Sequence, residues 1–436
     1  MKIVKLLASL TLAALPLYII RCKSFSWCRS PLPFTLLELL ILATFFAWAV
    51  WRVSAVKKEK KTLQRLFKGL TGPLFWPLVL FLMSATIAVF VSPDLRAAAG
   101  IWKAYFIEPV LFFVVVLDLS IEKRSLSWAV VPLLFSGLWL SALAIWQAIS
   151  GTNQFAQYAI AQGRVSSVYT TPNALGLYLG PLVALSLGFL FQLFKQKRIE
   201  LNRFGLAWYL IICLLAFIAA IILSKSRGAA LGIIVALLAF LLMVIYPLLS
   251  NYWQRLLRLV AVFAVVAYFL LNFFVFVRIN NLVTAYQPRS QDSIAARFCI
   301  WQATKNILED RPITGIGLSG FPKVYPDYAT CEKENFQYPH NIFLNFWTEI
   351  GIVGLLSFLW VVYRYWKILS PLIDNFVVVG LLAAMVYIFI HGLVDVPYFK
   401  NDLAVEFWVF LTLGTWFYES RLKEKAASRF QRPRLD

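Results

Sequence analysis

The sequence contains two histidines, and His340 is the one better placed for acid–base chemistry. It is followed by Asn341 and stands where a long polar segment meets an apolar run. A neutral imidazole can accept a proton near pH 7, so His340 is a candidate general base, with Asn341 as a supporting residue. The alternative is an interfacial histidine that only packs or forms a structural hydrogen bond.

The second histidine, His391, is followed four residues later by Asp395. Residues at this spacing share one face of a helix, so the two side chains could form an orienting pair. A purely structural hydrogen bond explains the same spacing, and both interpretations stay open.

Positively charged side chains form a second group of candidates. Lys225 and Arg227 lie in the short turn SKSRGA between two apolar runs. A guanidinium can bind phosphate oxygens in a bidentate manner, so this turn suits an anionic ligand, whereas contact with lipid headgroups is the alternative. Arg164 and Arg297 stand in segments predicted below to be external, where each could join a phosphate site or pair with surface carboxylates.

Several familiar sites are not expected. Two histidines and the absence of a CxxC pair leave too few ligands for a metal site. No D-x-D pair offers carboxylates for a metal-bound nucleotide sugar. Residues 315–320 (GIGLSG) match the spacing GxGxxG, but no βαβ unit surrounds them, so no dinucleotide site and no cofactor are expected.

The composition shows which elements must carry these residues. Of the 436 residues, 61% are hydrophobic and 14% are charged, with 41 Lys and Arg against 21 Asp and Glu. Soluble domains average about 45–50% apolar and about 25% charged residues. A cytosolic enzyme, a secreted disulfide scaffold and a disordered chain are therefore excluded. The sequence predicts an all-α polytopic membrane protein.

A membrane-spanning helix needs roughly 20 mostly apolar residues, and the sequence offers about 12 candidates. They are residues 3–20, 32–51, 73–92, 102–119, 128–149, 174–194, 206–223, 229–249, 259–277, 342–363, 375–392 and 403–418. The first resembles a signal peptide but lacks a clear cleavage site, so it is kept as a span. Glu38, Lys103, Glu108 and Glu349 lie in or beside these runs, where unpaired charges are costly.

The distribution of positive charge predicts the topology. Residues 52–72 carry seven Lys and Arg, and residues 419–436 carry six. Ten runs separate these segments, so both are expected in the cytoplasm. The predicted organisation is spans 1–9 in residues 1–277, a large periplasmic loop in 278–341, spans 10–12 in 342–418 and a basic cytoplasmic tail in 419–436. An amphipathic helix is predicted over residues 292–310 of the loop.

Four of the five cysteines fall in predicted external segments, as two pairs: Cys22 with Cys28, and Cys299 with Cys331. Disulfides are typical of an oxidising compartment, but buried free thiols are equally compatible with the sequence. Whether either pair is bonded stays open.

The sequence resembles the O-antigen ligase-like membrane proteins, a family that includes O-antigen ligases and some O-antigen and exopolysaccharide polymerases. The resemblance covers about residues 160–400 and rests on TTPNALGLYLGP, SKSRGAALG, RFCIWQATKNILEDRPITGIGLSGF and HNIFLNFWTEIGIVGLLSF, in this order. It implies a glycosyltransferase C-type architecture and glycosyl transfer at the periplasmic face of the bacterial inner membrane. The implied donor is a glycan on undecaprenyl diphosphate. The implied acceptor is the lipid A core or another lipid-linked glycan.

The resemblance also implies roles for single residues. Arg227 and Arg297 match the diphosphate-binding arginines of the family. His340 matches its candidate base, which would activate the acceptor hydroxyl for inverting attack at the anomeric carbon. Arg164 matches less closely, and His391 and Asp395 less closely still. Neither a metal nor a nucleotide sugar is required.

Three functions remain as alternatives. The His340–Asn341 pair resembles the ligase branch more, so an O-antigen ligase is preferred over a polymerase of the same family. A transporter of lipid-linked glycans would also need cations facing a diphosphate, and a non-catalytic envelope scaffold would leave His340 replaceable. The expected partners are the lipid-linked donor, the glycan acceptor and membrane lipids, but no nucleic acid.

Overall fold

The computed structural model describes residues 1–21, 34–56, 72–123, 125–195, 201–260, 263, 270, 293–329 and 336–430. Within these ranges the chain is helical, with one isolated β-bridge between Arg21 and Thr35. The helices are α1 (Lys2–Ala13), α2 (Leu36–Val56), α4 (Phe75–Val91), α5 (Leu95–Ile101), α6 (Glu108–Lys123), α7 (Ser127–Ser150), α8 (Gln157–Ala161), α9 (Pro172–Lys195), α10 (Leu201–Ser224), α11 (Arg227–Ile245), α13 (Ser293–Asp310), α14 (Phe321–Tyr328), α15 (Ile342–Leu369), α16 (Phe376–His391) and α17 (Asn401–Phe430). A π-helical segment, η3 (Trp102–Ile107), joins α5 to α6.

The part of the chain that the structure describes is all-α and has the long apolar helices of a membrane protein. Among the described residues, seven helical segments are long and apolar enough to cross a membrane: Leu36–Ser54, Leu95–Glu122, Ser127–Ser150, Pro172–Lys195, Phe204–Ser224, Arg227–Leu248 and Ile342–Leu372. The helices α4 and α16 are apolar but shorter. The predicted span over residues 259–277 lies almost entirely outside the described residues, and each of the other predicted runs overlaps a helix. The number of spans therefore stays a prediction.

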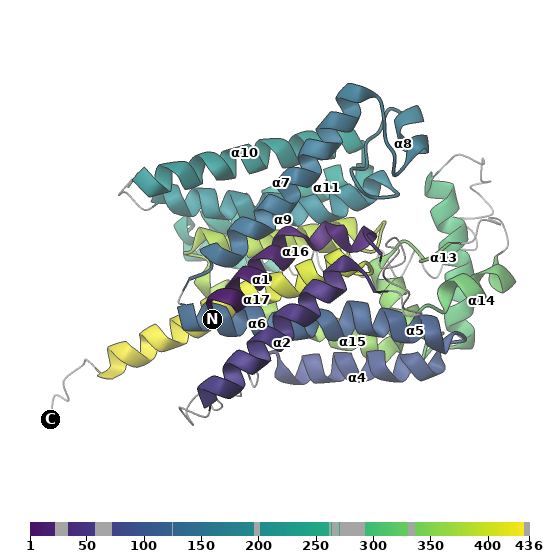
Figure 1. Ribbon diagram of the computed structural model, residues 1–436, viewed down its shortest axis with the longest axis horizontal. Helices are drawn as coiled ribbons and strands as arrows, with labels where there is room; N and C mark the ends of the chain where they lie inside the picture. The colour runs from purple at the N-terminus through teal and green to yellow at the C-terminus, as the bar shows by residue number, and fades with distance from the viewer. Residues whose placement is uncertain are drawn as a thin grey trace.

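The helices α7, α9, α10 and α11 lie on one side of the bundle and α2, α4, α6 and α15 on the other, with α1, α16 and α17 between them (Figure 1). In one group α9 packs against α7, α10, α11 and α16, and in the other α4 packs against α15 while α6 packs against α17 and α2. Glycines allow the closest contacts. A Cβ at Gly180 would overlap the ring of Tyr387, whose hydroxyl donates to the carbonyl oxygen of Gly176 at 2.7 Å.

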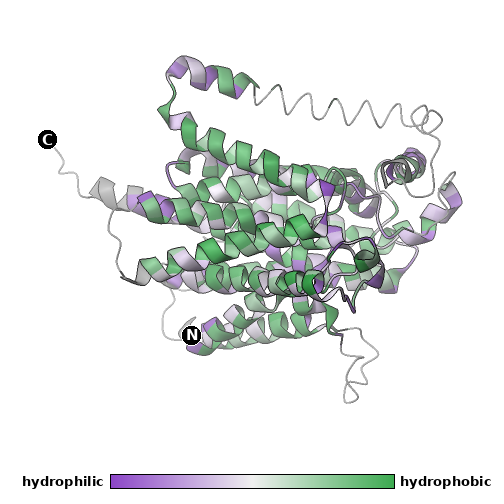
Figure 2. Cartoon of the chain, turned by 90° about the horizontal axis from the view of Figure 1, so that it is seen from above, coloured by the Kyte–Doolittle hydropathy of each residue, from purple (hydrophilic) through white to green (hydrophobic). Residues whose placement is uncertain are grey.

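The two ends of the bundle differ. Hydrophobic residues follow the length of the helices, and hydrophilic residues gather towards their ends (Figure 2). The helices α8, α13 and α14 lie at one end, and the start of α1 and the end of α17 point towards the other (Figure 1). We call the end with α8, α13 and α14 the loop end. The predicted helix over residues 292–310 is confirmed as α13.

A break in α15 holds part of the loop end in place. Gly351 has a φ of 72° within the helix, and the chain before α14 fills the gap. The amide of Ile316 donates to the carbonyl of Thr348 at 2.8 Å, and the amide of Ile352 donates to the carbonyl of Ile313 at 3.0 Å. The backbone groups that the break frees are thus paired within the protein, as a membrane helix requires.

This contact explains the GxGxxG spacing. Gly315 and Gly317 have φ values of 64° and 81°, and a Cβ on either would overlap neighbouring backbone. The amide of Ser319 donates to Oε2 of Glu349 at 2.6 Å. The glycines thus allow this loop to pack closely between α4 and α15.

The cysteines are only partly described. Cys299 on α13 is disulfide-bonded, and Cys213 is buried and free. Cys22, Cys28 and Cys331 lie outside the described residues.

Candidate active site

His340 lies immediately before α15 and is held there by its neighbours. Its φ of 48° places it in the left-handed region, which is uncommon for a residue other than glycine. Asn341 caps the helix, because its Oδ1 accepts two amides of the first turn at 3.0 and 3.2 Å. On the other side, Trp301 of α13 donates to the carbonyl of Pro339 at 2.8 Å. The strained backbone of His340 is thus fixed from both sides.

The same segment is bonded to the turn that follows α16. Asn341 Nδ2 donates to the carbonyl of Leu393 at 3.1 Å, and the amide of Ile342 donates to the carbonyl of Gly392 at 2.7 Å. These bonds join two segments that are far apart in the sequence. They bring the beginning of α15 next to residues 392–395.

This junction pairs His340 with Asp395. Nδ1 of His340 lies 3.4 Å from Oδ1 of Asp395. The His340 side chain is 33% exposed and the Asp395 side chain 10% exposed, so the imidazole reaches the surface above a largely buried carboxylate. A proton on Nδ1 facing this carboxylate leaves Nε2 as the acceptor, which is the arrangement of a histidine general base.

The surroundings of Asp395 keep it ionised. Burial raises the pKa of this carboxyl, but the hydrogen bond with His340 and the nearby charges of His340, His391 and Arg297 outweigh burial and lower it below 3.8. Arg297 also ties α13 to the turn, because its Nε donates to the carbonyl of Val394 at 3.0 Å. Burial lowers the pKa of the Arg297 guanidinium, although an arginine stays protonated in a protein.

Three further predicted cations form a cluster of their own, which we call the cationic cluster: Arg164, Lys225 and Arg227. Arg164 Nε donates to the carbonyl of Ser224, the last residue of α10, at 2.9 Å. Its Nη2 donates to Oδ1 of Asn173 at 3.2 Å. A Cβ on Gly163 would lie 3.1 Å from Nζ of Lys225, so this ammonium lies over the backbone beside Arg164.

Arg227 is the exposed first residue of α11. Burial lowers the pKa of Arg164, and the charge of Arg227 lowers it further. The positive charge of Arg227 thus acts against that of Arg164. The N-terminus of α11 adds a partial positive charge. A multivalent anion bound here would relieve this repulsion.

The cationic cluster and the His340–Asp395 pair are connected through Gly228. A Cβ on Gly228 would lie 2.7 Å from Cδ2 of His391 and 2.9 Å from Cγ2 of Val394. The residue after Arg227 thus packs directly against the turn that carries Asp395. The structure therefore brings all the predicted site residues into one region at the loop end.

His391 has a different partner from the one that its spacing suggested. The helix α16 ends at His391, so Asp395 lies beyond the helix, and the expected pair on one helix face is not formed. Asp395 faces His340 instead. Nδ1 of His391 lies 2.9 Å from the hydroxyl of Tyr387, and this hydroxyl already donates its proton to Gly176. Nδ1 must therefore be the donor, and His391 packs between α9, α11 and α16.

Sequence reasoning did not single out Lys400, Asp402 and Tyr169, which lie beside the site. Tyr169 donates to Oδ2 of Asp402 at 2.7 Å, and Nζ of Lys400 lies 5.5 Å from the centre of the Tyr169 ring. Burial lowers the pKa of Lys400, although the negative charges of Asp402 and Asp395 act to raise it. The sequence feature that could have pointed to Lys400 and Asp402 is the polar stretch KND, which interrupts the apolar sequence before α17.

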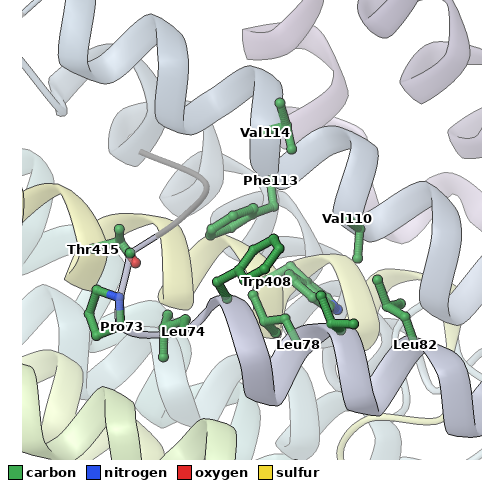
Figure 3. A pocket seen from close by; sticks show the side chains of 12 residues that line it. Pro73, Leu74, Leu78, Leu82, Val110, Phe113, Val114, Trp408 and Thr415 are labelled. Carbon is green, nitrogen blue, oxygen red and sulfur yellow. The ribbon is translucent and has the colours of Figure 1, made fainter. Parts of the chain in front are cut away.

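An apolar hollow of about 180 Å³ lies elsewhere, between α4, α6 and α17 (Figure 3). Leu78, Leu82, Val110, Phe113 and Trp408 are among the side chains that line it. Among the described residues, its lining contains no acidic or basic side chain and none of the predicted site residues. This composition suits hydrocarbon rather than polar chemistry.

Comparison with known proteins identifies the region that contains most of this site. Residues 211–359 match the family model described as O-antigen ligase. This stretch of the chain is similar to the O-antigen ligase family, and the match covers about a third of the 436 residues. It contains Arg227, Arg297 and His340, whereas Arg164 and Asp395 lie outside it.

One curated protein is also similar to part of this chain. A protein of Rickettsia conorii, provisionally named a polysaccharide ligase, is 33% identical to it over 90 residues. The match covers 19% of this chain and 22% of that protein. Both matches are thus to proteins described as ligases, and each covers only part of the chain.

Proposed function

We propose that this protein is an O-antigen ligase. It would transfer a glycan from undecaprenyl diphosphate to a hydroxyl of a lipid A-core acceptor, with inversion and without a metal. The observation that carries the proposal is the packing of Gly228 against His391 and Val394. This contact places a cluster suited to a diphosphate beside a histidine suited to be a base.

The proposed base is Nε2 of His340. It takes the proton of the acceptor hydroxyl as the acceptor oxygen forms its bond to the anomeric carbon. Asp395 holds the proton on Nδ1 and stabilises the imidazolium that results, as the carboxylate does in other histidine dyads. The strained backbone of His340 and the cap at Asn341 fix the ring in position.

The proposed diphosphate site is the cationic cluster together with Arg297. As the bond between the anomeric carbon and the diphosphate oxygen breaks, negative charge develops on the leaving group. Arg164, Lys225 and Arg227 would neutralise it, and guanidinium groups suit phosphate oxygens in geometry as well as charge. Undecaprenyl diphosphate leaves, and the hydroxyl proton remains on His340.

We also propose the topology that this function needs. The chain would cross the bacterial inner membrane about 12 times, in a glycosyltransferase C-type architecture, with the loop end in the periplasm. The placement of α8, α13 and α14 opposite the start of α1 and the end of α17 supports this arrangement (Figure 1).

A reconstitution experiment tests the function. The purified protein is incubated with an undecaprenyl-diphosphate glycan, with and without a lipid A-core acceptor, and the products are separated on a gel. We expect transfer only when the core is present. Chain lengthening without the core would identify a polymerase instead. An absence of product in both mixtures would favour a transporter or a scaffold.

A further inference from the structure

Lys400 stands directly before α17, in the connecting segment of residues 392–400 that also carries Asp395. Its side chain is half-buried, and its Nζ lies 5.5 Å from the centre of the Tyr169 ring. In the part of the chain that the structure describes, this ammonium has neither a hydrogen-bond acceptor nor a carboxylate within 4 Å. An ammonium has three N–H donors, and those of Lys400 are thus available to a ligand.

Two carboxylates act on Lys400 by their charge but are bonded to other donors. The negative charges of Asp402 and Asp395 both act on the ammonium. However, Oδ2 of Asp402 accepts the hydroxyl of Tyr169 at 2.7 Å, and its Oδ1 accepts the amide of the next residue at 3.0 Å. Oδ1 of Asp395 lies 3.4 Å from Nδ1 of His340. The two carboxylates therefore favour the charged form of Lys400 without binding it directly.

The contact with Tyr169 connects Lys400 to the cationic cluster. Tyr169 is four residues before Asn173, whose Oδ1 accepts from Nη2 of Arg164 at 3.2 Å. Four residues of fully extended chain span at most about 14 Å, so the backbones of Tyr169 and Asn173 lie within this distance. The helix α9 begins between them, at Pro172, and its N-terminus adds partial positive charge.

Lys400 also has neighbours on the side of the proposed base. Asp395, which pairs with His340, lies five residues earlier in the same connecting segment. The ring centre of Phe399 is 6.4 Å from that of Tyr338, two residues before His340. The connecting segment thus places this lysine beside both halves of the proposed site.

We propose that Lys400 is a further ligand of the donor, and that its ammonium binds the phosphate bonded to the anomeric carbon. This inference rests on the proposed function. That phosphate must lie near the cationic cluster, which binds the rest of the diphosphate, and near the base, which serves the carbon under attack. When the bond between the anomeric carbon and the phosphate oxygen breaks, its electron pair stays on that oxygen. Lys400 stabilises the new charge and keeps its own proton, while the hydroxyl proton goes to His340.

Binding of a soluble donor analogue tests this proposal without any turnover. Farnesyl diphosphate and farnesyl monophosphate are titrated by calorimetry against the purified full-length protein in detergent, and the wild type should prefer the diphosphate. Lys400→Met should weaken binding of the diphosphate about tenfold or more, because a hydrogen bond between charged groups is lost. It should change the Kd of the monophosphate less than about twofold, because the cationic cluster still binds a single phosphate. Lys400→Arg should keep the diphosphate Kd within about fivefold, since a guanidinium also binds phosphate.

Two further variants separate a ligand from a structural counter-charge. Lys323→Met removes a lysine at the same end of the bundle, whose Nζ lies 2.9 Å from Oδ2 of Asp94, and should leave both Kd values unchanged. Lys400→Met combined with Asp402→Asn removes the ammonium together with the buried charge that acts on it. The Tm of this double variant should return towards that of the wild type, whereas its binding of the diphosphate should stay weak. It also keeps the test possible if Lys400→Met alone does not fold.

Recovery of diphosphate binding in the double variant would show that Lys400 only balances the charge of Asp402, and would overturn the proposal. An unchanged Kd in Lys400→Met, equal losses for both ligands, a similar loss in Lys323→Met or no binding by the wild type would overturn it as well. The reconstitution experiment tests the function separately. If diphosphate binding depends on Lys400 but no glycan is transferred, the proposed function fails and this site stands. If glycan is transferred and Lys400→Met binds normally, the site fails and the function stands.

Discussion

Nδ1 of His340 lies 3.4 Å from Oδ1 of Asp395, across 55 residues of sequence. Neither residue is positioned by its own helix. His340 precedes α15 and Asp395 follows α16, and the hydrogen bonds of Asn341 and Ile342 to residues 392–393 bring the two segments together. The proposed base therefore depends on a junction between two chain segments.

The first prediction concerns the charge of Asp395. Asp395→Asn should reduce the rate of transfer on the order of 100-fold, because the neutral amide no longer stabilises the imidazolium. The carboxyl pKa in the folded protein is below 3.8, so Asp395 is ionised throughout pH 5–8. The loss should therefore be similar at every pH in this window. A defect confined to one end of the window would contradict this role.

The same pKa predicts how Asp395 contributes to stability. A carboxyl whose pKa is lowered on folding stabilises the protein above its unfolded value, and this contribution is lost as the pH falls through the folded value. The stability that Asp395 contributes over Asp395→Asn should thus persist from pH 8 down to pH 5 and be lost only below about pH 4. Thermal unfolding in detergent across this range measures it. A difference that shrinks already between pH 7 and 5 would be inconsistent with an ionised, stabilised Asp395.

The second prediction separates the position of His340 from the stability of the helix. Asn341→Ala removes a helix cap and should therefore cost about 1 kcal/mol of stability. It should also reduce the rate of transfer, because the backbone of His340 is no longer held in position. Asn375→Ala is the matched control, because Asn375 caps α16 in the same way, through the amide of Val377 at 2.9 Å. The control should lower the Tm by a similar amount and keep normal activity. Equal loss of activity in both variants would point to a general effect of destabilisation.

The third prediction tests the contact that connects the two halves of the site. Gly228→Ala should push the N-terminus of α11 away from His391 and Val394 and should lower activity strongly, with a stability cost of about 1–3 kcal/mol. Gly205→Ala in α10 is the control, because a Cβ there meets nothing within 4 Å. It should be neutral or slightly stabilising. Normal activity of Gly228→Ala would show that the spacing of the two halves is not critical.

The fourth prediction concerns the cationic cluster. Arg227→Gln should reduce transfer at least 100-fold, since the developing charge on the diphosphate loses a direct partner. Arg164→Gln should have a smaller effect on transfer and a larger one on stability, because Arg164 also bonds Ser224 and Asn173. Initial rates and Tm values of both variants test this ordering. A larger loss of transfer in Arg164→Gln than in Arg227→Gln would instead make Arg164 the main ligand of the diphosphate.

Much of the helical fold could be predicted from the sequence because long apolar runs are stable in a membrane only as helices. The candidate residues could also be chosen, since histidines are rare and external arginines stand out against an apolar background. The partner of Asp395 could not be predicted from the sequence. Its spacing from His391 fits a helix face, but α16 ends at His391, and the pairing with His340 depends on tertiary hydrogen bonds.

A polar cleft of about 710 Å³, lined among others by Arg21, Arg96 and Lys103, shows the same limit. Arg21 and Arg96 belong to segments that are not adjacent in sequence, and each alone looks like an ordinary charge at the edge of a span. Only the packing of α2, α5 and α17 brings them to one lining. The charges of Lys103 and Glu38 were predicted to need partners in the membrane, and the structure pairs them with each other.

The most direct test of the proposed function is a single-turnover measurement on His340→Ala. The purified variant is mixed with radiolabelled undecaprenyl-diphosphate glycan and a lipid A-core acceptor, and labelled core is counted against time. We expect a rate at least 100-fold below that of the wild type, in a variant that is still folded at the assay temperature and binds the donor as the wild type does. Transfer at the wild-type rate by the folded variant would show that His340 is not the base.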